Sequence, residues 1–145
     1  MRNKKILIVD DDADIRRGYQ VLLAAHDYDT LVASDASSSL AAADAHKPDL
    51  IILDLGLPAV PRAESILPLP EPSGGFLVRE RLAADKNLAV IPVVVVSGLD
   101  PNVNRRRAIR GGAMAFVEKP SDQKKLLAII GQLLGSPEIL THQPN

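Results

Sequence analysis

Several side chains that could do chemistry stand directly after short apolar runs. Three acids, residues 10–12, follow the run at 6–9, and Asp54 closes the run at 50–53. A buried strand is a costly place for a carboxylate, because a charge that leaves water loses its hydration unless a partner compensates. Asp54 therefore indicates a functional site at the end of a strand.

Two later apolar runs also end in polar residues. Ser97 follows residues 93–96, and Lys119 with Pro120 follows residues 115–118. Considered alone, a serine or a Lys-Pro pair after a strand usually only makes a turn. If the runs are parallel strands of one sheet, however, their carboxyl ends meet. The shared site then combines several carboxylates, one hydroxyl and one ammonium group.

The expected chemistry follows from the charges. Two carboxylates 4 Å apart repel by about 4 kcal/mol at an effective dielectric constant near 20. A hard divalent cation relieves this repulsion, and Mg²⁺ takes one or two carboxylates together with a phosphoryl oxygen. A carboxylate can also act as a nucleophile and form an aspartyl phosphate, with Lys119 and Ser97 contacting the transferred oxygens.

The elements that must position these residues alternate along the chain. In residues 12–26, Ile15, Tyr19 and Leu23 recur at helical spacing, and Asp12 is expected to cap that helix. This βα alternation predicts an α/β fold with a parallel sheet covered by helices on both faces. Strands are expected at 6–9, 30–33, 50–54, 93–96 and 115–118, and helices at 12–26, 36–45, 76–85, 100–110 and 122–134.

Length and composition narrow the class of protein. The 145 residues suit one domain, expected at 1–135 and followed by a polar tail at 136–145, with no output domain. The absence of cysteine excludes disulfides and thiolate metal sites and fits a cytoplasmic protein. A net charge of −1 and 3% aromatic residues argue against nucleic-acid binding, and no apolar stretch can span a bilayer.

Four segments in order resemble one known family. They are KKILIVDDDADIR, PDLIILDLGLP, PVVVVSG and GGAMAFVEKPSD, and the resemblance covers residues 4 to about 134. Together they resemble the receiver domain of two-component response regulators, in its single-domain, chemotaxis-regulator-like form. The resemblance implies a doubly wound (βα)5 flavodoxin-like fold with strand order 2-1-3-4-5. It also implies a signalling phosphoacceptor, which assists its own phosphorylation and dephosphorylation, rather than an enzyme.

The resemblance assigns roles to the acidic residues. Asp54 matches the phosphoacceptor of the family. Asp10 and Asp11 match the acidic pair that holds Mg²⁺ or Mn²⁺, Asp11 directly and Asp10 through water. The backbone carbonyl of Gly56 and the carboxylate of Asp54 complete the implied set of metal ligands.

Four further positions match family residues. Ser97 resembles the switch hydroxyl, and Lys119 resembles the lysine that contacts the phosphoryl group. Pro120 resembles a proline that follows a cis peptide bond, which would aim Lys119. Phe116 stands where the family has a rotating aromatic side chain, although plain core packing explains a phenylalanine there equally well.

The implied partners are proteins. A sensor histidine kinase or a histidine phosphotransfer protein would supply the phosphoryl group, and an unknown downstream protein would respond. Arg105, Arg106, Arg107 and Arg110 form either a solvated helix face or a docking patch for an acidic partner. The residues leave open whether phosphorylation makes a homodimer, and a piece of a longer chain would have the same pattern.

The chain departs from the family pattern after Asp54. The family has a glycine about eight residues further on, whereas Gly75 lies 21 residues further on here. The Pro-rich insertion at about 59–74 is either a tolerated surface loop, since loop length costs little entropy, or a cover for the site or a partner contact. In the family that the chain resembles, the side chains two residues after Asp54 and Ser97 control how water reaches the phosphoryl group. Gly56 and Leu99 stand there and cannot hold a water by a side-chain hydrogen bond, so the resemblance implies a long-lived phosphoryl group.

Three other functions compete with the receiver hypothesis. A haloacid-dehalogenase-type phosphatase also uses an aspartate nucleophile, but it needs an acid where Gly56 stands. A dinucleotide-binding domain needs a GxGxxG segment after the first strand, where residues 10–12 are acids instead. A receiver-like scaffold that is never phosphorylated would not need the full set of site residues.

Overall fold

The computed structural model describes residues 3–57, 74–98, 109, 115–118 and 123–135. Within these residues, five parallel strands form one sheet in the order β2-β1-β3-β4-β5, which confirms the predicted fold class. The strands are β1 (Lys5–Val9), β2 (Asp29–Ala33), β3 (Leu50–Asp54), β4 (Val93–Ser97) and β5 (Ala115–Glu118). The described helices are α1 (Ala13–Ala24), α2 (Ala36–His46), α3 (Gly74–Ala84) and α5 (Gln123–Leu134).

The sequence located these elements to within about two residues of their observed ends. One difference concerns the site, because β4 includes Ser97 rather than ending before it. Ser97 lies opposite Glu118 in the parallel register of β4 and β5, so strand pairing continues through the serine. The helix expected at 100–110 lies outside the described residues except for Ile109, which is helical.

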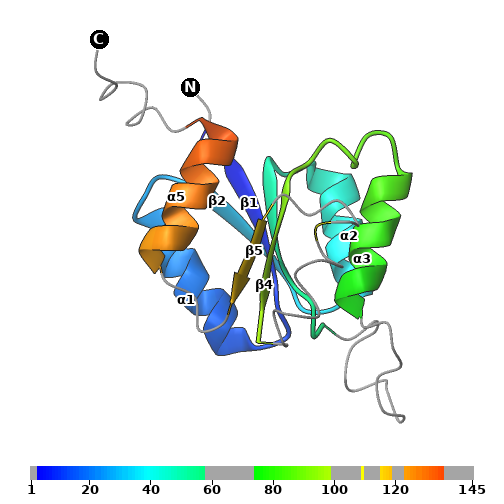
Figure 1. Ribbon diagram of the computed structural model, residues 1–145, viewed down its shortest axis with the longest axis horizontal. Coiled ribbons are helices and arrows are strands. Elements are labelled where there is room, and N and C mark those ends of the chain that lie inside the picture. The colour runs from blue at the N-terminus through cyan, green and yellow to red at the C-terminus, as the bar shows by residue number, and fades with distance from the viewer. Residues whose placement is uncertain (1–2, 58–73, 99–108, 110–114, 119–122, 136–145) are drawn as a thin grey trace.

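The helices cover both faces of the sheet, α1 and α5 on one face and α2 and α3 on the other (Figure 1). Alternate residues of each strand point to opposite faces, so that Ile6 and Ile8 pack toward α1 and α5 while Leu7 and Val9 pack toward α2 and α3. Both faces are therefore apolar, which explains the continuous apolar runs in the sequence. Each fully buried leucine or isoleucine contributes about 1.5–3 kcal/mol.

Helix caps support the loops that follow the strands. Asp12 caps α1 as predicted, since its carboxylate accepts hydrogen bonds from the backbone N–H groups of Asp14 at 2.9 Å and Ile15 at 3.3 Å. Asp35 caps α2 in a capping box with Ser38. The acids that open these two helices thus have a structural role, which separates them from Asp10, Asp11 and Asp54.

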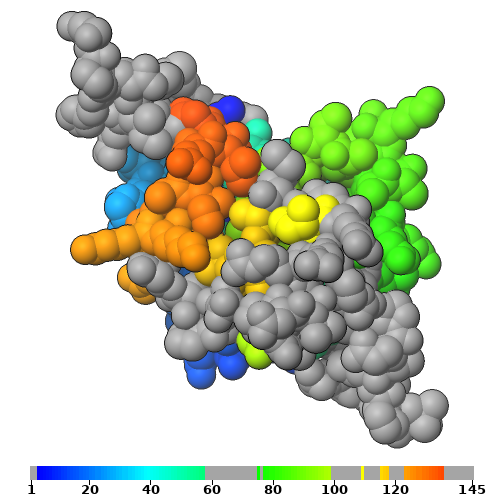
Figure 2. Space-filling view, in the orientation of Figure 1, coloured from blue at the N-terminus to red at the C-terminus, as the bar shows by residue number. Residues whose placement is uncertain are grey.

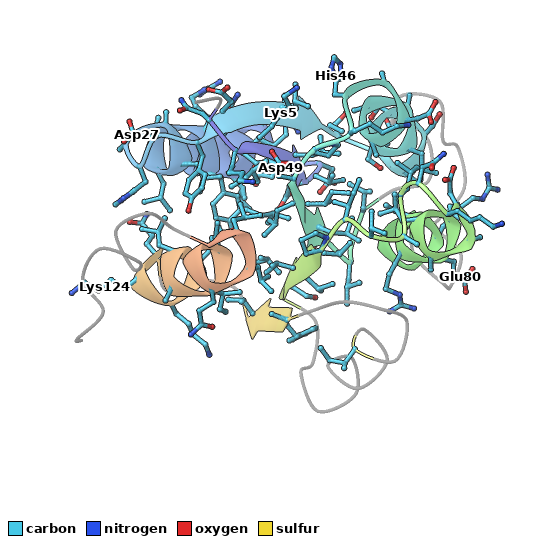
Figure 3. All side chains as sticks on the ribbon, turned by 90° about the horizontal axis from the view of Figure 1, so that it is seen from above. Lys5, Asp27, His46, Asp49, Glu80 and Lys124 are labelled. Carbon is cyan, nitrogen blue, oxygen red and sulfur yellow. The ribbon has the colours of Figure 1, made fainter. Side chains whose placement is uncertain are left out.

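Seen from above, the sheet lies between its two helical layers (Figure 3). The exposed side chains of Asp27, His46, Glu80 and Lys124 lie around the periphery. In the space-filling view, α5 in orange and α3 in green lie on opposite sides of one face (Figure 2). His26 and His46 are exposed, and His142 lies outside the described residues. In the part of the chain that the structure describes, no helix is long and apolar enough to cross a bilayer.

Candidate functional site

Three carboxylates meet at the carboxyl ends of β1 and β3. Val9 pairs with Leu53 in the register of these strands, so the residues that follow, Asp10 and Asp54, leave the sheet side by side. One carboxylate oxygen from each of Asp10, Asp11 and Asp54 lies within 4.8 Å of the others. Asp10 and Asp54 are buried and Asp11 is half-buried. Like charges are thus held together where water screens them poorly.

Asp10 is held by hydrogen bonds to residues of β2, of the loop after β1 and of α1. Its backbone N–H donates to the carbonyl of Ala33 at 3.1 Å, which ties the loop to β2. Its Oδ1 accepts from the N–H of Asp12 at 3.0 Å. Its carbonyl accepts from Nη1 of Arg16 at 2.7 Å. Arg16 was not among the site residues predicted from the sequence. Its position in the first turn of the helix that follows Asp10 and Asp11 is the signal that could have indicated it.

Asp54 is held by the turn that follows β3. Its Oδ1 accepts a hydrogen bond from the backbone N–H of Gly56 at 3.1 Å. A Cβ atom at Gly56 would lie 3.6 Å from that same Oδ1, which is an ordinary contact distance. Position 56 therefore faces the Asp54 carboxylate, and glycine leaves the space beside it without a side chain.

The first turn of α3 packs directly behind Asp54. A Cβ atom at Gly75 would lie 2.5 Å from both the carbonyl oxygen of Asp54 and the Cα atom of Leu55. No residue with a side chain fits at this separation, because the obstructing atoms are backbone. Gly75 therefore lets α3 approach the peptide that carries the acid, despite the 21 residues between the two positions.

Ser97 and Phe116 lie on the strands beyond β3. Asp54 pairs with Val96, so Ser97 stands one residue further along the neighbouring strand, and it is buried. Phe116 pairs with Val95 and is buried in the core toward α2 and α3. The other predicted positions lie outside the described residues, namely Lys119, Pro120, Leu99, the arginines at 105–110, most of the Pro-rich insertion and the tail at 136–145.

The donor set at the strand ends suits a hard cation. All three side chains offer carboxylate oxygen, two of the residues are buried, and their oxygens are close enough to share one ion. Oxygen-only donors of this kind are typical of Mg²⁺ and Mn²⁺ sites. A cation held there would lower the cost of bringing a phosphoryl group to a carboxylate.

The family model of the response regulator receiver domain matches residues 6–131. The chain belongs to this family. It is therefore a receiver domain of a two-component system, and this membership decides against the phosphatase and dinucleotide-binding hypotheses. The acidic cluster lies where the strand order brings the first and third strands together, as the resemblance led us to expect.

Curated relatives include both longer and similarly sized proteins. The receiver is 34% identical over 130 residues to the transcriptional regulator RpaA of Synechocystis, covering 90% of this chain and 48% of RpaA. It is 30% identical to PhoP of Bacillus subtilis, covering 94% of this chain and 51% of PhoP. The chain thus spans about half the length of these two relatives. Its match to PilH of Pseudomonas aeruginosa, at 28% identity, covers 90% of this chain and 97% of PilH.

Solved structures show the same fold. The receiver domain of NtrX from Brucella abortus is 31% identical, with a TM-score of 0.74 over 90% of this chain and 98% of that one. A receiver domain of a Francisella response regulator is 23% identical, with a TM-score of 0.77 over 92% of this chain and 98% of that one. The receiver therefore shares its architecture even with distant members.

Proposed function

We propose that this receiver accepts a phosphoryl group on Asp54 from a phosphohistidine of a sensor histidine kinase or a histidine phosphotransfer protein. An Asp54 oxygen forms the new bond to phosphorus while the phosphorus–nitrogen bond breaks and the histidine leaves. The observation that carries the proposal is the burial of the Asp54 carboxylate beside those of Asp10 and Asp11 at the strand ends. Grouping three carboxylates at a partly buried position is electrostatically unfavourable, which favours a functional role.

The metal ligands in this proposal are the carboxylates of Asp10, Asp11 and Asp54 and the carbonyl of Gly56. A bound Mg²⁺ or Mn²⁺ would neutralise charge on the carboxylates and on the incoming phosphoryl oxygens. The Gly56 N–H already donates to Asp54 Oδ1 at 3.1 Å, which orients the carboxylate before any partner arrives. The close spacing of the three carboxylates supports this assignment.

The signal in this proposal is a change in the contacts of the phosphoryl group. The Ser97 hydroxyl would donate to one phosphoryl oxygen and the Lys119 ammonium to another, with Pro120 orienting the lysine. The position of Ser97 at the end of the strand next to Asp54 supports its share of this role. Phe116 would then repack, so that a local change of charge biases a two-state element.

The output we propose is protein binding or onward phosphotransfer, performed in the cytoplasm by a domain at residues 1–135 with a tail at 136–145. Direct nucleic-acid binding is not part of the proposal, because the chain has a net charge of −1. The downstream partner is a protein that distinguishes the phosphorylated from the unphosphorylated surface. Comparing the hydrodynamic size of the two forms tests whether that partner is a second copy of the receiver.

The experiment that tests the phosphoacceptor is intact mass measurement after incubation with acetyl phosphate and Mg²⁺. We expect one added phosphoryl group in the wild type, none in Asp54→Asn, and none in the wild type after chelation of the metal. Asp49→Asn is the matched control, because Asp49 stands at the other end of β3 and should not affect labelling. Absence of labelling in the wild type would favour a scaffold that is never phosphorylated.

A further inference from the structure

Arg16 makes a short hydrogen bond to the loop that presents the acids. It lies on α1 and is half-buried, and its Nη1 donates to the carbonyl oxygen of Asp10 at 2.7 Å. A hydrogen bond from a charged donor at this length is stronger than one between neutral groups. The contact is therefore suited to hold the loop in one conformation.

This carbonyl belongs to the peptide between Asp10 and Asp11. The orientation of that peptide sets the direction in which both side chains leave the backbone. The Asp10 N–H is already held by Ala33, and its carboxylate by the N–H of Asp12. Arg16 holds the backbone carbonyl of Asp10, and with it the peptide that joins two of the three carboxylates.

We propose that Arg16 is a positioning residue that preorganises the Asp10 and Asp11 carboxylates for a divalent cation. The inference rests on the proposed function, because it assumes that these acids hold the metal. Arg16 does not touch the ion in this proposal and acts only through the backbone. Groups that orient metal ligands in this way commonly change metal affinity by about 10–100-fold when they are removed.

The direction of the change in metal affinity distinguishes a positioning role of Arg16 from a purely electrostatic one. A guanidinium group beside the site repels a cation, so loss of its charge alone would tighten metal binding. Loss of the hydrogen bond frees the Asp10–Asp11 peptide and would weaken metal binding. Weaker binding after removal of a nearby positive charge is therefore the signature of the positioning role.

The measurement is Mn²⁺ affinity of the unphosphorylated full chain, from the electron paramagnetic resonance signal of free Mn²⁺. We expect Arg16→Gln to weaken binding about tenfold. Arg17→Gln is the matched control, because it removes the same charge one residue along α1. The Arg17 side chain is largely exposed, and its Nη1 lies 3.5 Å from Oδ1 of Asp14. We expect Arg17→Gln to leave affinity unchanged or slightly tighter.

Two further variants guard against a trivial loss of folding. Arg16→Met retains the apolar stem and should weaken binding as Arg16→Gln does. Arg16→Lys retains a charged donor that can reach the carbonyl and should recover most of the affinity. In the metal-free protein, the N–H of Asp12 should exchange with solvent faster in Arg16→Gln than in Arg17→Gln, because its acceptor on Asp10 is no longer held in place.

The possible outcomes are distinct. Equal or tighter Mn²⁺ binding in folded Arg16→Gln and Arg16→Met, relative to wild type, would overturn the positioning role and leave the metal site standing. If the wild type itself does not bind Mn²⁺, or Asp11→Asn binds as well as wild type, the proposed metal site fails instead. Faster Asp12 exchange with weaker binding, recovered by lysine, would establish the inference.

Discussion

The two ends of the sheet use aspartate in opposite ways. At the amino end, Oδ2 of Asp49 accepts from the backbone N–H of Lys5 at 2.8 Å, and the Asp49 N–H donates to the Lys5 carbonyl at 2.8 Å (Figure 3). The backbone N–H of Asp29 likewise donates to the carbonyl of Lys4 at 2.9 Å, at the same end of the sheet. At the carboxyl end, carboxylate oxygens of Asp10, Asp11 and Asp54 lie within 4.8 Å of one another.

Strand β3 makes this contrast within a single element, because Asp49 precedes it and Asp54 closes it. The carboxylate of Asp49 satisfies a backbone donor and so stabilises the start of the pairing with β1. The carboxylate of Asp54 has an oxygen within 4.8 Å of those of two other acids, which brings like charges together at a buried position. Unfavourable electrostatics of this kind are typical of functional sites.

The largest expected difference between the two ends is their response to metal. Mg²⁺ at about 100 times its Kd should raise the free energy of unfolding of the wild type by about 2.7 kcal/mol. We expect Asp11→Asn to lose most of this gain and Asp49→Asn to keep it. Chemical denaturation of each protein with and without Mg²⁺ measures this gain in the free energy of unfolding. An equal gain in all three proteins would place the metal elsewhere.

The second prediction concerns the backbone contact that exists only behind the carboxyl end. Gly75→Ala forces a Cβ atom against the Asp54 carbonyl and Leu55, and should lower the free energy of unfolding by about 2 kcal/mol. Gly18→Ala on α1 is the control, because nothing lies within 4 Å of the added atom. It should raise stability by about 0.7 kcal/mol. Equal effects in thermal or urea unfolding would contradict the close approach of α3.

The third prediction compares the same substitution at the two ends of β3. Without metal, Asp54→Asn removes like-charge repulsion and should raise the free energy of unfolding by about 1 kcal/mol. Asp49→Asn weakens the hydrogen bond to the Lys5 N–H and should lower it by about 1 kcal/mol. Urea denaturation in a chelating buffer measures both values. The comparison breaks down if both substitutions shift stability in the same direction.

The smallest expected effect concerns water at the carboxyl end. An asparagine at position 56 would place a polar side chain beside Asp54, where the added Cβ atom makes only an ordinary contact. We expect Gly56→Asn to speed loss of the phosphoryl group about threefold, because the amide can hold the attacking water. Intact mass followed over time after removal of acetyl phosphate measures the rate. A slower rate, or one equal to that of Gly18→Ala, would contradict a role for this position.

Most of the architecture could be predicted because its signals are local. Continuous apolar runs indicated all five strands, and Asp12 marked the start of α1. The ends of the strands and helices were predicted less accurately than their presence. Ser97 illustrates this, because its pairing with Glu118 extends β4 by one residue. A cross-strand partner is invisible to periodicity along one segment.

The proximity of Asp10, Asp11 and Asp54 could be predicted as well, since parallel strands bring their carboxyl ends to one edge. Two other contacts could not. The hydrogen bond from Arg16 to the Asp10 carbonyl depends on the path of the loop into α1. Gly75 lies close to the backbone of Asp54, although an insertion separates the two in the sequence. The length of that insertion does not predict where α3 packs.

The sequence by itself determined which groups the receiver can use, because apolar runs must be buried and the polar residues that end them must emerge at the edge of a sheet. Only the tertiary structure decided which groups lie beside each acid. The carboxylate of Asp12 accepts from the first turn of α1, that of Asp35 from Ser38, and that of Asp49 from the Lys5 N–H where the pairing of β1 and β3 begins, whereas the carboxylates of Asp10, Asp11 and Asp54 lie within 4.8 Å of one another. The side chain is the same in every case, and the free energy of its charge depends on the donors and charges that folding brings beside it.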